Sequence, residues 1–173
     1  MILLKNGRGQ LGTSLAGRIS KSNYRYRYST EDIFIYHTWD MDNKNDEDIQ
    51  KQCLTKFKLF IDNNKDNKII FVSTYSEQSN LYNLYKQKAE GYLLSNHDSG
   101  IVIKLPVLLG KGICQKLKDK KIPPYGDIEL MTVEEAATSI ISIAVTCGNN
   151  KNRIYRLNGT YVPATLVSAL LHF

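Results

Sequence analysis

Short apolar runs alternate with longer segments in which apolar residues recur at helical spacing. The apolar runs predict buried strands over residues 1–5, 32–39, 68–72 and 153–157 and over the first part of 100–112. The helical spacing predicts helices over 46–62, 80–95 and 133–147, and Thr132 with Glu135 predicts a capping box for the last of them. Strands that alternate with helices are typical of an α/β domain with a mainly parallel sheet.

Two later segments are less regular. Residues 113–130 are basic and are broken by a Pro-Pro pair, which predicts an irregular connection. The Asn-Gly pair at 158–159 predicts a turn, and we expect a short helix over about 163–173 to close the chain.

Residues 22–30 alternate aromatic and basic side chains, the pattern of a half-exposed strand. Almost no residues separate this segment from the predicted strand over 32–39, whereas parallel neighbours need a crossover of a dozen or more residues. Residues 24–28 therefore either are not a parallel strand or lie antiparallel at the edge of the sheet.

Length, composition and charge narrow the class of protein. The chain has 173 residues, 42% of them apolar and 23% charged, so we expect one globular domain over 1–173. The net charge of +6 is spread among acidic residues, which favours a solvated surface over a nucleic-acid face, with a basic groove for an anionic small molecule as the alternative. Three cysteines without CxxC spacing and three scattered histidines indicate a reducing compartment and give little support to a metal site. With no signal peptide and no apolar stretch of bilayer length, we expect a cytoplasmic protein without membrane contacts.

A glycine-rich loop follows the first apolar run and precedes a predicted helix over 13–19. The loop consists of Gly7, Arg8, Gly9, Gln10, Leu11 and Gly12. A G-x-G-x-x-G sequence between a strand and a helix lets the backbone approach a pyrophosphate, and the free N–H groups of the helix bind the anion. The loop predicts a dinucleotide site, and a glycine-rich turn without a ligand is the alternative.

Basic residues near this loop indicate which dinucleotide it would bind. An arginine beside the adenosine ribose suits the 2′-phosphate of NADP, whereas an acid there suits NAD. Arg8, Arg25 and Arg27 favour NADP(H) over NAD(H), although Glu31 and Asp32 also lie near the expected place of a ribose-binding acid. The same aromatic and basic stripe could contact RNA, but it is too short to favour that hypothesis.

Tyr82 and Lys86 are a candidate catalytic pair. Positions four apart on a helix share a face, so the phenol and the ammonium can converge. A cation close to a phenol favours the phenolate, which makes a tyrosine a usable acid or base. Ser73 and Thr74, at the end of the preceding predicted strand, place hydroxyls nearby.

Four stretches of the chain, in order, resemble one known family. They are the strand and glycine loop over 3–12, Ser73-Thr74 followed by Tyr82 and Lys86, the Leu-Pro loop over 104–112, and the helix entry over 132–137 with the later 155–159. Together they resemble the extended short-chain dehydrogenase/reductase family of NAD(P)-dependent nucleotide-sugar epimerases, dehydratases and reductases. The resemblance implies a Rossmann-like sheet with helices on both faces and a reduced, vestigial substrate-binding region from about residue 107.

The resemblance also implies roles for individual residues. Tyr82 would be the general acid or base at a sugar hydroxyl or ketone, and Lys86 would bind the nicotinamide ribose and favour the Tyr82 phenolate. Thr74 or Ser73 would hydrogen-bond the reacting oxygen, while hydride moves between the nicotinamide and a sugar carbon. The cofactor-binding residues would be Gly7, Arg8, Gly9, Gln10, Leu11, Gly12, Arg25, Arg27, His37 and Pro106.

The family pattern is not complete in this chain. The glycine loop is one residue shorter, the strand-helix unit after the second strand is missing, and Trp39 stands near the cofactor position where the family has small residues. We therefore keep a second hypothesis, a catalytically degenerate member that binds a nucleotide or a partner protein. The resemblance further suggests a homodimer through the helices over 46–62 and 80–95.

Overall fold

The computed structural model describes residues 1–5, 8–21, 32–76, 79–110, 113–121, 123–147 and 153–167. The helices are α1 (Gly9–Lys21), α2 (Glu47–Asp62), α3 (Leu81–Asn96), α4 (Ile113–Lys118) and α5 (Val133–Thr146). The strands are β1 (Ile2–Lys5), β2 (Ile33–Tyr36), β3 (Lys68–Thr74), β4 (Gly100–Leu105), β5 (Val107–Leu108), β6 (Asp127–Met131), β7 (Ile154–Arg156) and β8 (Thr160–Pro163), followed by the 3₁₀ helix η1 (Ala164–Leu166).

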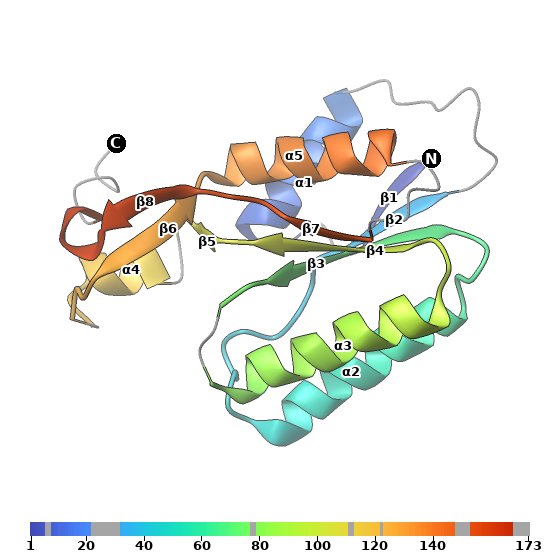
Figure 1. Ribbon diagram of the computed structural model, residues 1–173, viewed down its shortest axis with the longest axis horizontal. Coiled ribbons are helices and arrows are strands. Elements are labelled where there is room, and N and C mark those ends of the chain that lie inside the picture. The colour runs from blue at the N-terminus through green and yellow to red at the C-terminus, as the bar shows by residue number, and fades with distance from the viewer. Residues whose placement is uncertain are drawn as a thin grey trace.

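Five strands form a parallel sheet in the order β1-β2-β3-β4-β7. Helices α1 and α5 pack together on one face of this sheet, and α2 and α3 pack together on the other (Figure 1). Apolar strand residues face both helix layers, so the core is divided into one cluster on each side. The prediction of a Rossmann-like α/β fold with a mainly parallel sheet is confirmed.

The order of the strands differs from that of a complete doubly wound sheet. There the order is 3-2-1-4-5-6, with the first strand inside the sheet. In the described part of this chain, β1 is instead at the edge. Each connection from β1 to β4 steps in the same direction, yet α1 lies on the face opposite α2 and α3 (Figure 1). If all three crossovers were right-handed, α1, α2 and α3 would lie on the same face of the sheet. Helix α1 instead lies on the face that it occupies in a doubly wound sheet, where further strands lie beyond β1.

A second, three-stranded sheet in the order β5-β6-β8 follows the large one. The prediction that residues 113–130 are irregular is wrong, because they contain α4 and β6. Helix α4 has six residues, too few to show helical spacing, and β6 is fixed by pairing with the distant β8. The expected closing helix begins where it was predicted, as the 3₁₀ helix η1 directly after Pro163, whereas the strand β8 before it was not predicted; residues 168–173 are outside the described residues.

Capping side chains set where the main helices begin. Asp46 accepts a bond from the backbone N–H of Ile49, and Thr132 and Glu135 form the predicted capping box of α5. Helix α1 begins at Gly9 instead of residue 13, so Gly12 lies inside the helix and not in a loop before it. No helix in the described part of the chain has the length and apolar character needed to cross a membrane.

Candidate active site at the carboxyl ends of the strands

Tyr82 and Lys86 meet on the first two turns of α3. The helix begins at Leu81 because the Asn80 side chain accepts a hydrogen bond of 2.9 Å from the backbone N–H of Asn83. Lys86 Nζ donates to the Tyr82 hydroxyl at 3.3 Å and lies 5.2 Å from the centre of its ring. The structure therefore brings together the phenol and the ammonium that the sequence spacing paired.

The Lys86 ammonium is buried, with 5% of the residue exposed. It also donates to the backbone carbonyl of Val72 at 3.0 Å and lies 5.3 Å from the centre of the Phe71 ring. Among the described residues, no carboxylate forms an ion pair with it. Lys86 is thus a buried cation held by a carbonyl, a phenol and two ring faces.

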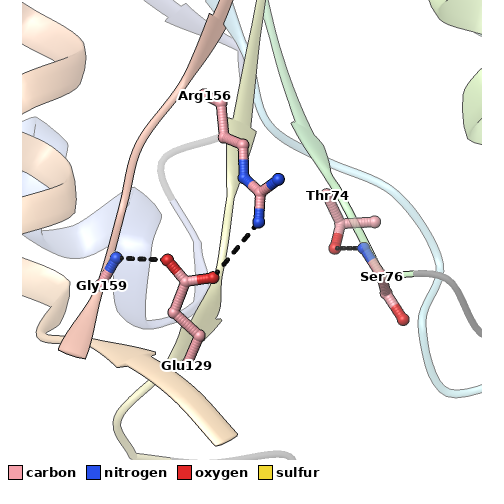
Figure 2. Close-up of polar contacts among 5 residues, drawn as sticks. All are labelled: Thr74, Ser76, Glu129, Arg156 and Gly159. Atoms are coloured by element: carbon pink, nitrogen blue, oxygen red, sulfur yellow. Dashed lines mark hydrogen bonds and ion pairs between the residues drawn. The ribbon is translucent and has the colours of Figure 1, made fainter. Parts of the chain in front are cut away.

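The two hydroxyls at the end of β3 have different surroundings. Successive strand residues point to opposite faces, so Ser73 and Thr74 cannot both face the same ligand. Ser73 is buried and donates its hydroxyl proton to the Glu90 carboxylate. Thr74 is half-buried, and its oxygen accepts a bond of 3.2 Å from the backbone N–H of Ser76 (Figure 2). The Thr74 hydroxyl therefore keeps its proton for another acceptor.

The described part of the glycine loop consists of Arg8 and the first turn of α1, which begins at Gly9. Gly9 has a φ of +77°, a conformation that favours glycine. Gln10 packs against Gly110, where an added Cβ would lie 2.4 Å from Gln10 Oε1. Arg8 is exposed, and Gly12 is buried in α1.

A pocket of about 570 Å³ lies beside Gly9, the first residue of α1. Its lining consists of Arg8, Gly9, Tyr36, His37, Thr38, Trp39, Asp40, Asp42, Cys53 and Lys56. Two basic and two acidic side chains are in this set, and bonds from the Asn43 backbone and side chain hold the pKa of Asp40 below its usual value. The pocket thus combines Arg8, Gly9 and His37 of the predicted cofactor residues.

Other predicted cofactor residues lie elsewhere. Leu11 is half-buried in α1, packed against the core, and Pro106 is buried between β4 and β5. Neither lines the pocket. Gly7, Arg25 and Arg27, with the predicted strand over 24–28, lie outside the described residues.

Trp39 is fixed in the wall of this pocket. Its Nε1 donates to Gln50 at 2.7 Å, and its ring centre lies 6.2 Å from that of Phe57 and 5.8 Å from that of Phe71. Phe71 in turn carries the Lys86 ammonium on its ring. Trp39 is therefore part of the packing that connects the pocket with the Tyr82–Lys86 pair.

The sequence patterns missed two groups of residues near the site. Glu90 is one helical turn beyond Lys86, and its carboxylate binds Ser73 and, at 2.8 Å, Lys104 Nζ. The spacing of four residues from 82 to 86 and from 86 to 90 could have indicated that Glu90 lies on the same helix face as the pair. Lys104 had no such signal, because only the pairing of β4 with β3 places it beside Ser73.

The second group lies between the two sheets (Figure 2). Glu129 on β6 accepts a 2.7 Å bond from the backbone N–H of Gly159 and lies 3.5 Å from Arg156 Nη2 at the end of β7. The Arg156 guanidinium carbon lies 3.9 Å from the centre of the Tyr75 ring. Burial, and next the neighbouring Glu129 carboxylate, raise the pKa of Tyr75. These residues come from segments far apart in the sequence, so no local pattern could have shown them.

Comparison of the structure finds similar solved structures, whereas comparison of the sequence finds no match. No protein-family model and no curated protein sequence matches the chain. A UDP-N-acetylglucosamine 4-epimerase from Bacillus cereus is similar with a TM-score of 0.70 at 14% identity, covering 97% of this chain and 81% of the epimerase. A dTDP-4-dehydrorhamnose reductase from Clostridium acetobutylicum gives 0.71 at 10% identity, covering 98% and 79%. A dTDP-glucose 4,6-dehydratase from Bacillus anthracis, solved with NAD, gives 0.64 at 12% identity, covering 97% and 78%. The chain therefore has the Rossmann-like fold of these three enzymes, which is the fold that the resemblance of its four sequence stretches implied.

Proposed function

We propose that the protein is an NAD(P)(H)-dependent oxidoreductase or epimerase that acts on a nucleotide-linked sugar. The observation that carries the proposal is the 3.3 Å contact between the buried Lys86 Nζ and the hydroxyl of the half-buried Tyr82, at the carboxyl ends of β3 and β4. Ligands of open α/β sheets bind at that edge. The similar solved structures named above, two of them a nucleotide-sugar epimerase and a nucleotide-sugar dehydratase, support this class of substrate.

Each residue of the group has a distinct task in this proposal. Tyr82 donates or accepts the proton of the reacting sugar oxygen, and Lys86 stabilises its phenolate. Two bonds leave one N–H donor of Lys86 for a ribose hydroxyl of the cofactor. Thr74 donates its hydroxyl proton to the reacting oxygen, whereas Ser73 is already bonded to Glu90. The nicotinamide, when bound, supplies or accepts hydride.

The described residues fit two parts of a nicotinamide cofactor, its pyrophosphate and its nicotinamide half. Gly9, Arg8 and the N-terminus of α1 would hold the phosphates, since a helix N-terminus and an arginine both bind anions. His37 would line the path from there to Tyr82. We propose NADP(H) as the preferred cofactor on the basis of Arg8, together with Arg25 and Arg27 in the sequence.

The second sheet, β5-β6-β8, follows β4 directly and is our candidate for the reduced substrate-binding region from about residue 107. We also propose a homodimer through α2 and α3, which lie side by side on one face of the large sheet (Figure 1). Leu59 and Leu84 on these helices are 57% and 44% exposed, so a partner could cover them.

A non-catalytic nucleotide-binding protein is the second candidate. It is favoured by the position of β1 at the sheet edge in the described part of the chain, because the adenosine half of a dinucleotide binds beyond the first strand in a doubly wound fold. The fixed ring of Trp39 in the pocket wall also favours it.

Calorimetric titration with NADPH and NADH, followed by turnover assays with UDP- and dTDP-linked sugars, tests the proposal. We expect NADPH to bind and Tyr82→Phe to abolish turnover while NADPH still binds, because only the proton donor is removed. Tyr85→Phe is the matched control, since the Tyr85 hydroxyl binds Glu47 at 3.1 Å and not Lys86. Dinucleotide binding without turnover would establish the second candidate, and full turnover of Tyr82→Phe would refute the role of Tyr82. If neither dinucleotide bound, the proposed oxidoreductase would be refuted, and the second candidate would have to bind another nucleotide.

A further inference from the structure

We propose that Lys104 is a positioning residue for the Tyr82–Lys86 pair, because it holds Glu90 and so prevents Glu90 from drawing Lys86 away from Tyr82. The inference rests on the proposed function for its catalytic meaning, although its geometry stands without a cofactor.

Helix α3 places three ionisable or hydrogen-bonding side chains in one row. Tyr82, Lys86 and Glu90 follow one another at intervals of four residues, so they share a face. A carboxylate four residues from a lysine on a helix is in reach of an ion pair with it. Glu90 is therefore a competitor of Tyr82 for the Lys86 ammonium.

In the structure the Glu90 carboxylate is engaged elsewhere. Oε1 accepts the Ser73 hydroxyl, and Oε2 lies 2.8 Å from Lys104 Nζ. Glu90 is 7% exposed and Lys86 is 5% exposed, so water screens neither charge well. A buried cation on α3, Lys86, and a half-buried cation on β4, Lys104, could each pair with this carboxylate, and it has paired with Lys104.

Strand register puts Lys104 in this place. Residue 104 pairs with residue 73 between β4 and β3, and paired residues in adjacent strands point to the same face. Ser73 and Lys104 thus both contact the carboxylate of Glu90, which extends from α3 toward the sheet. Lys86, which lies one turn before Glu90 on α3, remains bonded to the Val72 carbonyl on β3 and to the Tyr82 hydroxyl.

Removing Lys104 tests the proposal directly. In Lys104→Met, Glu90 keeps the Ser73 hydroxyl but loses its cationic partner, and it is expected to form an ion pair with Lys86, which would break the bond from Lys86 to Tyr82. In the double variant Glu90→Gln/Lys104→Met no carboxylate competes, so the bond is expected to persist. Lys121→Met, which removes an exposed lysine paired with Asp119, is the control.

The readout is the ¹⁵N–¹H signal of the Lys86 ammonium in NMR spectra, assigned by its loss in Lys86→Arg. In the natural sequence, adding Tyr82→Phe should shift this signal, because the phenol is a hydrogen-bond partner. We expect that response to Tyr82→Phe to vanish in Lys104→Met and to return in the double variant. The control should respond as the natural sequence does.

Several outcomes would overturn the inference. An unchanged response in Lys104→Met would show that Lys104 does not protect the pair. A lost response in the double variant would show that Lys104 acts otherwise than through Glu90. The double variant leaves no buried carboxylate without a cation, so this second outcome can be read even if Lys104→Met does not fold. The measurement needs no cofactor, so a failure to bind NADPH would refute the proposed function and leave this inference standing.

Discussion

At the scale of the residue, Lys86 is a buried ammonium that no carboxylate pairs with in the described part of the chain. Lys86 is 5% exposed and is held by one carbonyl, one phenol and two aromatic rings. Burial of a charge costs free energy that hydrogen bonds only partly offset. A residue kept in such a place at a cost to stability is expected to serve function.

Lys86→Met should therefore separate stability from function. Methionine has a similar length and no charge, and apolar replacement of buried charges is often neutral or stabilising. We expect the free energy of unfolding to stay the same or rise, measured by urea denaturation, while NADPH binding measured by calorimetry weakens. A loss of more than about 1 kcal/mol of stability would mean that Lys86 is a net contributor to the fold.

At the scale of elements, the loop after β5 is packed against the start of α1. Gly110 has a φ of +141° and leaves no room for a Cβ beside Gln10. This contact joins the carboxyl side of β5 to the glycine loop, two regions that the sequence separates by about a hundred residues. Glycine is needed here for the backbone angle, and an added Cβ would also require the end of the Gln10 side chain to move.

Gly110→Ala should lower the free energy of unfolding by about 1–3 kcal/mol, because alanine rarely adopts this φ and Gln10 must move. The matched control is Gly17→Ala in the interior of α1, where nothing lies within 4 Å of the added Cβ. There we expect a gain of roughly 0.5–1 kcal/mol, since alanine is the better helix former. Urea denaturation measures both, and equal effects would contradict the account of Gly110.

At the scale of the whole molecule, Glu129 links the two sheets. It lies on β6 of the small sheet, and Arg156 on β7 of the large one. Burial opposes its ionisation, but the neighbouring Tyr75 hydroxyl, the Gly159 N–H and the Arg156 charge together hold the pKa of Glu129 below its usual value. The carboxylate form is therefore favoured by folding.

This difference in pKa gives the link a definite pH dependence. A carboxyl group whose pKa is lowered by folding contributes stability above its unfolded value, about 4.3, and loses that contribution as the pH falls through its folded pKa. We expect the stability advantage of the natural sequence over Glu129→Gln to be full at pH 7 and to shrink below about pH 4. Urea denaturation of both proteins across this range is the measurement. A constant difference between them would show that the ionisation of Glu129 does not stabilise the junction.

The sequence by itself determined the kind of fold and the central pair of the site. Apolar runs located β1, β2, β3, β4 and β7, and helical spacing located the three longest described helices, which are long enough for their periodicity to show. Capping residues such as Thr132 fixed helix starts locally. The pairing of Tyr82 with Lys86 also followed from local geometry, since one helix carries both residues.

Only the tertiary structure decided features that depend on distant segments. The six-residue α4 and the strands β6 and β8 lack a strong local pattern, and β6 and β8 are defined by their pairing with each other. Strand order placed β1 at the edge of the described sheet and α1 on the face opposite α2. The assignment of Ser73 to Glu90 instead of to a ligand, and of Lys104 to the same carboxylate, follows from strand register. Local sequence specifies what is settled within one helix or strand, whereas contacts between elements exist only once their packing has fixed which side chains meet.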